Sequence, residues 1–502
     1  MLHLDQEAAR CLLCVNAPCT KACQTGDPAR AIRAIRFGNE ALAQLWITDC
    51  NDDDLRRAEE ACIHYDRPIR IREMLREAAE RSSDKNTDPT SDKNSKPDAT
   101  RTSDPKKLPG LEIDFCGIKC ENPFFLASSA ICTNYGMVAR AFEMGWAGVY
   151  YKTICKQDIH EVSPRFDAVG DQGQGDFYGF RNMEQLSENP VETDFEYLHR
   201  LKEKYPTKVV IASIMGQTEE QWIELAKMAE EAGVDAVELN FSCPQMRLTG
   251  MGSDVGQNAE LVTFYTAYVK RNVHIPIIPK MTPNITHINQ PAMGAYFAGA
   301  DAVSAINTIK SITMSPQAAV RDRLTVSGYS GRAVKPIALR FIYEMAANPI
   351  MHNVQLSGIG GIETWRDALE FIQLGCRNVQ ICTAVMQYGY RIIDDLILGL
   401  QHYMQQRGIE HLGDLVGERL PDFSMPSDLD RSSIVYPVID RDRCIGCGRC
   451  YTSCLDGGHQ AISFDSVLRR PRIVGSRCVG CHLCRLVCPT AAIKGGRRIT
   501  KR

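Results

Sequence analysis

Two runs of cysteine near the carboxyl terminus constrain this chain more than any other feature. They are Cys444-x2-Cys447-x2-Cys450-x3-Cys454 and Cys478-x2-Cys481-x2-Cys484-x3-Cys488-Pro489. This is the ligand spacing of two [4Fe–4S] clusters, in which the fourth cysteine of each run crosses to the other cluster. Paired zinc sites, the alternative, usually present two Cys-x2-Cys pairs per metal. We therefore expect one cluster on Cys444, Cys447, Cys450 and Cys488, and the other on Cys478, Cys481, Cys484 and Cys454.

The composition narrows the class of protein. At 502 residues the chain is long enough for two to four domains. Its net charge of −3 gives no basic footprint for nucleic acid or an anionic membrane. We find no signal-peptide core and no stretch near the roughly 18 apolar residues of a membrane span. We expect a soluble cytoplasmic protein without nucleic-acid or membrane partners, whose 21 cysteines are metal ligands, buried thiols and catalysts.

The chain divides into five parts. Residues 81–108 hold Ser, Asp, Lys, Asn, Thr and Pro with almost nothing apolar, which is typical of a flexible linker. Residues 1–80, before it, form a helical, cysteine-rich segment. Residues 109–412, after it, alternate short β-branched runs with amphipathic helical patterns. A connector, residues 413–435, then leads to a ferredoxin-like domain, residues 436–502, that carries both cysteine runs.

The middle part contains eight short apolar runs that we predict as strands, with helical patterns such as Glu219 to Ala232 between them. Alternation of strand and helix is typical of a parallel sheet covered by helices. Eight such units favour a (β/α)8 barrel, because a doubly wound sheet, the alternative, normally shows fewer repeats. The runs are Phe124 to Ser128, Gly148 to Lys152, Val209 to Ile214, Ala236 to Phe241, Ile277 to Met281, Ala302 to Ile306, Val354 to Ser357 and Val379 to Cys382.

A barrel places functional residues at the carboxyl ends of its strands, with phosphate bound after strands seven and eight. Strand seven ends in Ser357-Gly358-Ile359-Gly360-Gly361, whose glycines let backbone amides approach a phosphate closely. Strand eight ends in Cys382-Thr383. The sequence shows no Gly-x-Gly-x-x-Gly turn and no Gly-x4-Gly-Lys-Ser/Thr motif, so we expect a mononucleotide rather than NAD, FAD or ATP.

Polar residues also end the other predicted strands. Two of them are lysines, and a lysine in an apolar barrel mouth is costly unless an anion meets it. A reduced flavin is such an anion. The strand-end residues are Ser128, Lys152, Thr153, Asn240 to Pro244, Lys280, Asn307 and Thr308.

Seven longer stretches carry a family resemblance. They are Asn122-Pro-Phe-Phe-Leu-Ala-Ser128, Glu161-Val-Ser-Pro-Arg165, Glu238-Leu-Asn-Phe-Ser-Cys-Pro244, Lys280-Met-Thr-Pro-Asn284, Ile306-Asn-Thr-Ile-Lys-Ser311, Ser327-Gly-Tyr-Ser-Gly331 and Gly358-Ile-Gly-Gly-Ile-Glu363. Together they resemble the dihydroorotate dehydrogenase-like flavin barrels and, within these, the dihydropyrimidine dehydrogenases. The resemblance covers the barrel and the ferredoxin-like end.

The resemblance implies FMN as the cofactor, a pyrimidine base as the substrate and Cys243 as the catalytic residue. The FMN-binding residues that it implies are Ser128, Lys152, Thr153, Lys280, Gly331, Gly360, Gly361, Cys382 and Thr383. The substrate-binding residues that it implies are Asn182, Asn240, Ser242, Asn307 and Thr308.

These residue types suit that chemistry. A uracil ring presents two carbonyl acceptors and two N–H donors, and a carboxamide offers both a donor and an acceptor. Reduction of the 5,6 double bond needs a hydride at C6 and a proton at C5 from an acid on the opposite face. A thiol with a reference pKa of about 8.5 is mostly protonated at pH 7 and can be that acid. The remaining barrel cysteines have no such context, although we expect Cys116 and Cys120 to flank a small hairpin.

The first 80 residues contain Cys11-x2-Cys14-x4-Cys19-x3-Cys23. This resembles the N-terminal cluster motif of dihydropyrimidine dehydrogenases and of glutamate synthase small-subunit-like flavoproteins. Only Cys50 and Cys62 follow before the linker, so a second cluster with Cys23 and Cys50 lacks ligands. The resemblance implies one further [4Fe–4S] cluster on Cys11, Cys14, Cys19 and Cys62. The alternative is a helical domain retained for docking.

No FAD or NAD domain separates the N-terminal cysteines from the barrel. The resemblance therefore implies a separate FAD- and NAD-binding flavoprotein subunit, which passes electrons from NAD(P)H through the clusters to FMN. It also implies a homodimeric core or a heterotetramer. Two alternatives remain: a dihydroorotate dehydrogenase or other cyclic-amide reductase, and a non-catalytic electron-transfer subunit. The fused clusters argue against the first, and Cys243 with its surrounding asparagines argues against the second.

Overall fold

The computed structural model describes residues 4–83, 108–170, 177–244, 246, 250–312 and 325–501. They belong to two compact units, Ala8–Pro421 on one side and Asp422–Arg502 with Met1–Glu7 on the other. The linker predicted at residues 81–108 lies almost wholly outside the described residues, since helix α6 (Ile71–Ser83) ends at Ser83. No helix in the described part of the chain is long and apolar enough to cross a membrane.

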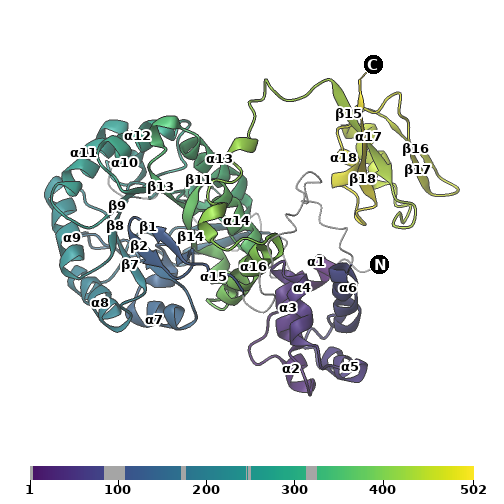
Figure 1. Ribbon diagram of the computed structural model, residues 1–502, viewed down its shortest axis with the longest axis horizontal. Coiled ribbons are helices and arrows are strands. Elements are labelled where there is room, and N and C mark those ends of the chain that lie inside the picture. Colours follow the sequence, from purple (N-terminus) through teal and green to yellow (C-terminus); the bar gives the residue numbers. More distant parts are fainter. Residues whose placement is uncertain are drawn as a thin grey trace. The chain divides into compact units, whose positions relative to one another are not determined.

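Eight parallel strands close into a barrel, which confirms the predicted fold (Figure 1). Neighbours around the barrel follow the order β10, β13, β14, β3, β4, β7, β8 and β9. Each strand overlaps one of the eight predicted apolar runs. Their bounds are β3 (Phe124–Leu126), β4 (Gly148–Tyr150), β7 (Val209–Ile214), β8 (Ala236–Asn240), β9 (Ile277–Lys280), β10 (Ala302–Ala305), β13 (Gln355–Ile359) and β14 (Cys376–Ile381).

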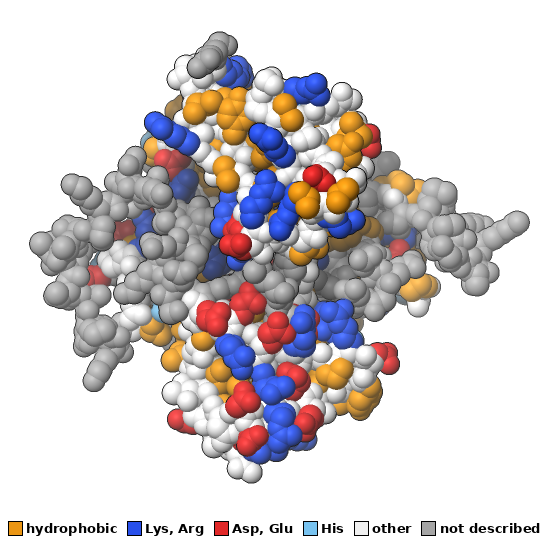
Figure 2. Space-filling model, turned by 90° about the vertical axis from the view of Figure 1, so that its right-hand side faces the viewer, with side chains coloured by type: hydrophobic (Ala, Val, Ile, Leu, Met, Phe, Trp, Pro, Cys, Tyr) orange, Lys and Arg blue, Asp and Glu red, His pale blue; other side chains and the backbone are white. Residues whose placement is uncertain are grey.

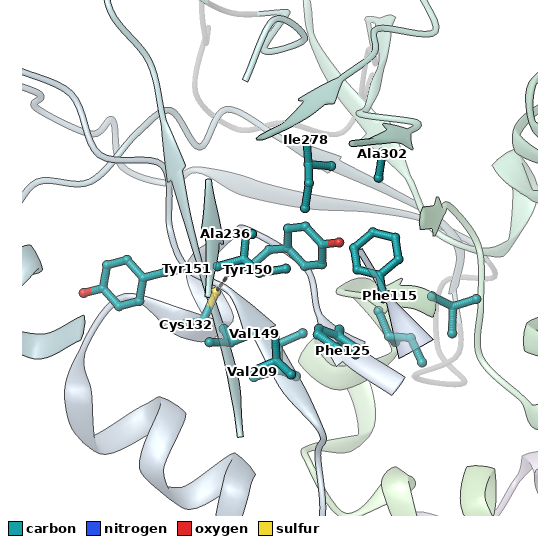
Figure 3. Close-up of a cluster of buried hydrophobic side chains, with 14 of the residues drawn as sticks. Phe115, Phe125, Cys132, Val149, Tyr150, Tyr151, Val209, Ala236, Ile278 and Ala302 are labelled. Carbon is teal, nitrogen blue, oxygen red and sulfur yellow. Dashed lines mark hydrogen bonds between the residues drawn. The ribbon is translucent and has the colours of Figure 1, made fainter. Parts of the chain in front are cut away.

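Fully buried side chains fill the centre of this unit. Figure 3 shows Phe125, Tyr150 and Ile278 among them, and all three have no exposed surface. The rings of Phe125 and Tyr150 lie 5.9 Å apart. The Tyr150 hydroxyl donates a hydrogen bond to Ser357 Oγ at 3.2 Å, so the polar end of the ring is paired. Burial of each such side chain stabilises the fold by roughly 2 kcal/mol.

Helices cover the outside of the barrel because each has an apolar face. Helix α9, for example, buries Trp222 and Leu225, and its N-cap Thr218 accepts a hydrogen bond from the backbone N–H of Gln221. The predicted helical pattern from Glu219 to Ala232 is thereby confirmed. The main helices of this ring are α7 (Tyr135–Glu143), α8 (Val191–Lys204), α9 (Glu219–Glu231), α11 (Ala259–Lys270), α12 (Asn289–Phe297), α13 (Lys335–Ala346), α14 (Trp365–Gln373) and α16 (Ile392–Arg407).

A second sheet, which the sequence did not predict, contributes residues to the carboxyl-end face of the barrel. Its antiparallel strands follow the order β11, β12, β6 and β5. Asn182 ends one strand and Ser330 ends another, so the sheet brings both residues to the mouth of the barrel. The bounds are β5 (Phe166–Gly170), β6 (Phe177–Asn182), β11 (Ile309–Ser311) and β12 (Ser327–Ser330).

A short antiparallel hairpin precedes the barrel. It consists of β1 (Ile113–Phe115) and β2 (Ile118–Cys120). Cys116 and Gly117 form its turn with φ values of 56° and 79°, as a tight hairpin turn requires. The hairpin expected around Cys116 and Cys120 is confirmed.

The N-terminal segment is helical, as predicted, and packs against the outside of the barrel. Arg33 Nε lies 2.7 Å from Asp395 Oδ2 on α16, and Asn39 donates to the Asp395 carbonyl at 2.9 Å. Arg391 donates to the carbonyl of Leu13 at 2.7 Å. The segment therefore docks near the N-terminus of α16. Its helices are α2 (Pro18–Ala22), α3 (Pro28–Arg36), α4 (Glu40–Ala43), α5 (Asp52–Glu60) and α6, and α1 (Leu4–Ala9) spans the boundary between the two units.

The C-terminal unit consists of two antiparallel strand pairs and two short helices. Strand β15 (Ser433–Ile439) pairs with β18 (Ile493–Thr500), and β16 (Ile462–Asp465) pairs with β17 (Arg470–Ile473). Helices α17 (Arg449–Gly457) and α18 (Leu483–Leu486) carry cysteines of the two runs.

The predicted connector, residues 413–435, is divided between the two units. The Gly417 N–H donates to the carbonyl of Ile372, and the Arg419 N–H donates to that of Gln373, so this part packs on the barrel. Strand β15 begins at Ser433.

Candidate active site

A cavity at the carboxyl ends of the barrel strands gathers the predicted site residues. All of the predicted FMN- and substrate-binding residues line it except Ser242, and Cys243 lines it as well. Phe166, Phe180 and Tyr329 of the second sheet also contribute. The empty space within it is about 1040 Å³, including the part open to solvent.

Three glycines shape one end of the cavity. Gly360 and Gly361 follow β13 with φ of 126° and 73°. A Cβ on Gly361 would lie 2.8 Å from the backbone nitrogen of Lys335, and one on Gly360 would lie 2.9 Å from Ala338 Cβ. A Cβ on Gly331 would lie 3.1 Å from the carbonyl of Tyr178. Side chains are thus excluded where backbone amides have to approach a phosphate, which fits the phosphate of a mononucleotide.

Both lysines at the barrel mouth are buried, and each has a carboxylate partner within the protein. Lys280 Nζ lies 3.2 Å from Glu238 Oε1, and Lys152 Nζ lies 2.7 Å from Glu184 Oε1. From the sequence we expected a reduced flavin to meet these charges. The carboxylates already do so, so the lysines alone are no proof of an anionic cofactor.

A chain of hydrogen-bonded side chains connects Lys280 with Ser128, and both of these residues line the cavity. Glu238 accepts hydrogen bonds from Ser213 at 3.0 Å and from Ser304 at 2.9 Å. Ser213 and Thr153 are 2.9 Å apart, and Thr153 in turn contacts Ser128 at 3.1 Å. These residues come from different strands, so the chain fixes the strand ends relative to one another.

The predicted substrate residues form a second chain of hydrogen bonds. Asn240 donates to Thr153 Oγ1 at 2.9 Å and accepts from the Ser242 hydroxyl at 2.7 Å. Asn307 donates to Ser242 Oγ at 2.8 Å and accepts from the Thr308 N–H at 2.7 Å. Ser242 is fully buried, and it orients both asparagines instead of lining the cavity.

Cys243 comes after β8 and is 6% exposed. Its carbonyl accepts a hydrogen bond from the Ser253 N–H at 2.9 Å. Gly252, with φ of 54°, leaves room for that carbonyl, which a Cβ would overlap. The backbone at Cys243 is thus held in place while its side chain lines the cavity. Residues 245 and 247–249 lie outside the described part of the chain.

Sequence reasoning missed several residues of this site. Glu238 and Glu184 neutralise the lysines, and Ser330 contacts Thr383 at 3.1 Å between their hydroxyls. Gln380 lines the cavity, and its Oε1 is buried without a hydrogen-bond partner in the described structure. An acceptor of this kind fits an N–H of a bound ligand such as a flavin ring. Glu238 could have been predicted as a site residue because it is an acidic residue inside an otherwise apolar strand.

The eight C-terminal cysteines surround two separate cavities. Cys444, Cys447, Cys450 and Cys488 line one, and Cys454, Cys478, Cys481 and Cys484 line the other. These are the two predicted ligand sets, including the crossed fourth cysteine. Backbone N–H groups of Ala461 and Ala492 each donate to the Sγ of the crossed cysteine, Cys454 or Cys488, at 3.3 Å. Such bonds adjust the reduction potential of a cluster.

Four N-terminal cysteines line a third cavity. They are Cys11, Cys14, Cys19 and Cys62, the set that the resemblance implied for a further cluster. The Arg36 guanidinium donates to the carbonyl of Cys11 at 2.8 Å, which ties the loop to helix α3. Cys23 and Cys50 do not line this cavity.

The fold and the cavity together define an oxidoreductase of the flavin-barrel class that is fused to an iron–sulfur domain. The family model for dihydroorotate dehydrogenase matches residues 110–404, and the model for a 4Fe–4S dicluster domain matches residues 437–494. The chain belongs to the dihydroorotate dehydrogenase family, as its motifs predicted. Neither model covers residues 1–80.

Individual relatives agree with this assignment. The NAD-dependent dihydropyrimidine dehydrogenase subunit PreA of Escherichia coli K12 is 50% identical over 392 residues, which cover 77% of this chain and 95% of that protein. The chloroplastic dihydropyrimidine dehydrogenase (NADP(+)) of Arabidopsis thaliana is 37% identical, over 64% of this chain and 79% of that protein. The catalytic subunit of dihydroorotate dehydrogenase B (NAD(+)) of Pyrococcus abyssi is 36% identical, over 61% of this chain and 98% of that protein.

Proposed function

We propose that this chain is the catalytic subunit of a dihydropyrimidine dehydrogenase. It reduces the 5,6 double bond of uracil or thymine reversibly, with FMN in the barrel. One observation carries the proposal. The cavity whose one end is shaped by glycines for a phosphate is also lined by Asn182, Asn240, Asn307 and Cys243. The names of the bacterial and plant relatives add support.

The asparagines suit a pyrimidine because their amides are oriented before it binds. Asn307 gives one N–H to Ser242 and accepts from the Thr308 N–H. The second N–H and the second lone pair of this amide remain for a ligand. A cyclic amide presents the complementary carbonyl and N–H groups, and a buried polar ring requires such partners.

FMN would be held by the glycines after β13 and β12, by Lys280, Lys152 and Thr153, and by Cys382 with Thr383. Bound there, it supplies hydride transfer to the C6 carbon of the pyrimidine. The Cys243 thiol gives the proton to C5 and takes it back in the reverse direction. Water inside the cavity would exchange protons in place of Cys243. The low exposure of Cys243 is consistent with a site that excludes water.

The clusters carry single electrons to the flavin from a partner flavoprotein subunit that binds FAD and NAD(P)H. Residues 422–502 contain fourteen Lys and Arg but only seven Asp and Glu. Figure 2 shows these basic side chains interspersed with hydrophobic ones on the visible face of this unit, the upper body in the view. An acidic docking surface on the partner complements this face. The assembly is a homodimeric core or a heterotetramer with that partner.

A substrate panel tests the proposal. The FMN-loaded protein is supplied anaerobically with a reduced viologen dye and with uracil, thymine or orotate, and the products are separated by chromatography. We expect dihydrouracil and dihydrothymine. Reduction of orotate alone would assign the chain to dihydroorotate chemistry, and no reduction of any cyclic amide would favour a non-catalytic electron-transfer subunit.

A further inference from the structure

Two cysteines of the N-terminal segment contact each other outside the cavity lined by Cys11, Cys14, Cys19 and Cys62. The Sγ atoms of Cys23 and Cys50 are 3.2 Å apart, although the residues are 27 positions apart in the sequence. Cys23 directly follows α2, and Cys50 directly precedes Asn51, the N-cap residue of α5. Two separate loops therefore bring their thiols together.

The surrounding loops hold this contact in place. The Asp27 N–H donates to the carbonyl of Trp46 at 2.8 Å, and the Thr25 hydroxyl donates to that of Asp49 at 2.8 Å. Gly26 lies against Cys50, and a Cβ at this position would overlap the Cys50 Sγ. The two loops are thus fixed to each other beside the thiols, and the glycine leaves the space that the Cys50 sulfur occupies.

The contact distance distinguishes this pair from metal ligands. Two sulfurs at 3.2 Å touch each other and leave no space for an iron cluster between them. A single zinc ion needs four ligands. The N-terminal cavity is lined by Cys11, Cys14, Cys19 and Cys62, and neither Cys23 nor Cys50 belongs to that set. Cys23 and Cys50 are therefore a pair of thiols.

We propose that Cys23 and Cys50 are a dithiol–disulfide couple, a redox site separate from the iron–sulfur ligands, which is oxidised by a small disulfide of the glutathione class. One protein thiolate attacks the small disulfide and releases one small thiol. The second protein thiol then attacks the mixed disulfide, forms the Cys23–Cys50 bond and releases the other small thiol. The protein loses two protons and two electrons, and the small disulfide is reduced to two thiols. The sulfurs need to approach by only about 1 Å to reach bonding distance.

The bond would close a loop that contains two of the residues in contact with the barrel. Arg33 and Asn39, which pair with Asp395, lie between Cys23 and Cys50 in the sequence. A cross-link around them restricts the unfolded segment, so oxidation stabilises its docked form. Burial and the adjacent Cys23 thiol raise the pKa of Cys50, so thiolate is scarce at neutral pH. Oxidation is therefore slow at pH 7 and faster as the pH rises.

Peptide mapping tests the proposal. The full-length holoprotein is equilibrated anaerobically with mixtures of reduced and oxidised glutathione, quenched in acid, alkylated and digested with trypsin. Cleavage after Lys21, Arg30, Arg36 and Arg56 gives peptides 22–30 and 37–56, each with a single cysteine. We expect these two peptides to be disulfide-linked in excess oxidised glutathione, and to separate again with excess reduced glutathione.

The variants Cys23→Ser and Cys50→Ser are the matched controls. Both should lose the linked peptide and keep the iron and sulfide content of the wild type. Iron loss in either variant would identify a cluster ligand and overturn the proposal. Alkylated or glutathionylated peptides without the 22–30 to 37–56 link would overturn it as well.

Thermal unfolding gives an independent readout. Oxidation should raise the Tm of the wild type and leave that of Cys23→Ser unchanged. An equal shift in both proteins, or none in the wild type, would show that the pair does not act as a redox cross-link.

Discussion

At the scale of single residues, the buried charges at the cavity neutralise each other in pairs. Lys280 and Glu238 are both almost fully buried and form an ion pair on neighbouring strands β9 and β8. Glu238 also accepts hydrogen bonds from Ser213 and Ser304, so its oxygens are well satisfied. A buried pair of this kind costs most when one partner is removed, because the other charge is left uncompensated.

The Lys280→Met substitution should therefore destabilise the barrel by about 3 to 5 kcal/mol. Adding Glu238→Gln should restore most of this loss, because the uncompensated carboxylate is gone, while FMN binding stays impaired. Urea unfolding followed by tryptophan fluorescence measures the effect. A double variant that is no more stable than Lys280→Met would show that the ion pair is not what the lysine stabilises.

The Cys243→Ala substitution should lower turnover by about 10² to 10⁴, because the proton donor to C5 is lost. The variant should keep its FMN and iron, since Cys243 is neither a cluster ligand nor part of the phosphate end. Cys155→Ala is the matched control, a buried cysteine that does not line the cavity. Loss of flavin from Cys243→Ala would mean that its role is structural.

For single residues, the sequence allowed us to predict those that follow a strand, but not the residues with which they form ion pairs or hydrogen bonds. Asn240 and Lys280 could be identified because they end predicted strands, which are local patterns, whereas the role of Cys243 was implied by the family resemblance. Glu184 could not, since it contacts Lys152 from 32 positions further along the chain. Ser242 was expected against the substrate, and only the folded arrangement shows it between the two asparagines.

Among the elements, the turn after β13 is the most constrained by its geometry. Gly361 has a positive φ, and a Cβ there would meet the backbone of Lys335 at the N-terminus of α13. Gly389, at the end of α15 (Thr383–Tyr388), has a similar φ of 82° but open space around it. Both glycines have a positive φ, but only Gly361 lies close to atoms that a side chain would meet.

The Gly361→Ala substitution should abolish FMN retention, because the new methyl group displaces the turn that approaches the phosphate. Gly389→Ala carries the same strain of about 1 kcal/mol and should keep its flavin. The ratio of flavin absorbance to protein measures both. Equal flavin content in the two variants would contradict a phosphate site at Gly361.

The eight barrel strands could be predicted because each is a short apolar run between helical patterns. The sheet formed by β5, β6, β11 and β12 could not. Its strands are three to six residues long, and the two pairs of consecutive strands, β5 with β6 and β11 with β12, are joined only by the long-range pairing of β6 with β12. No local periodicity marks such pairing, yet this sheet supplies Asn182 and Ser330 to the site.

For the whole molecule, we propose a chain of redox centres that ends at the barrel. The N-terminal cavity is lined by Leu12 and Cys14, and the carbonyl of Leu13 between them accepts a hydrogen bond from Arg391. Arg391 in turn donates to the carbonyl of Tyr388 at the end of α15, and Thr383 at the start of that helix lines the flavin cavity. The face of the barrel that the N-terminal helices cover could not be predicted from the sequence, because it depends on contacts between residues far apart in the chain.

The Cys14→Ser substitution should lower iron from about twelve to about eight atoms per chain, because one of three [4Fe–4S] clusters is lost. Cys23→Ser, which changes a cysteine outside the N-terminal cavity, should keep all of its iron. Iron and sulfide analysis of anaerobically prepared protein decides the point. Unchanged iron in Cys14→Ser would mean that the N-terminal segment only docks.

The central claim is that the clusters feed a pyrimidine-reducing flavin in this same chain, and electron counting tests it most directly. The holoprotein is fully reduced, freed of reductant and mixed anaerobically with excess uracil. We predict more than one dihydrouracil per FMN, because cluster electrons re-reduce the flavin after its first turnover. One dihydrouracil per FMN would contradict the electron path, and none would contradict the assigned reaction.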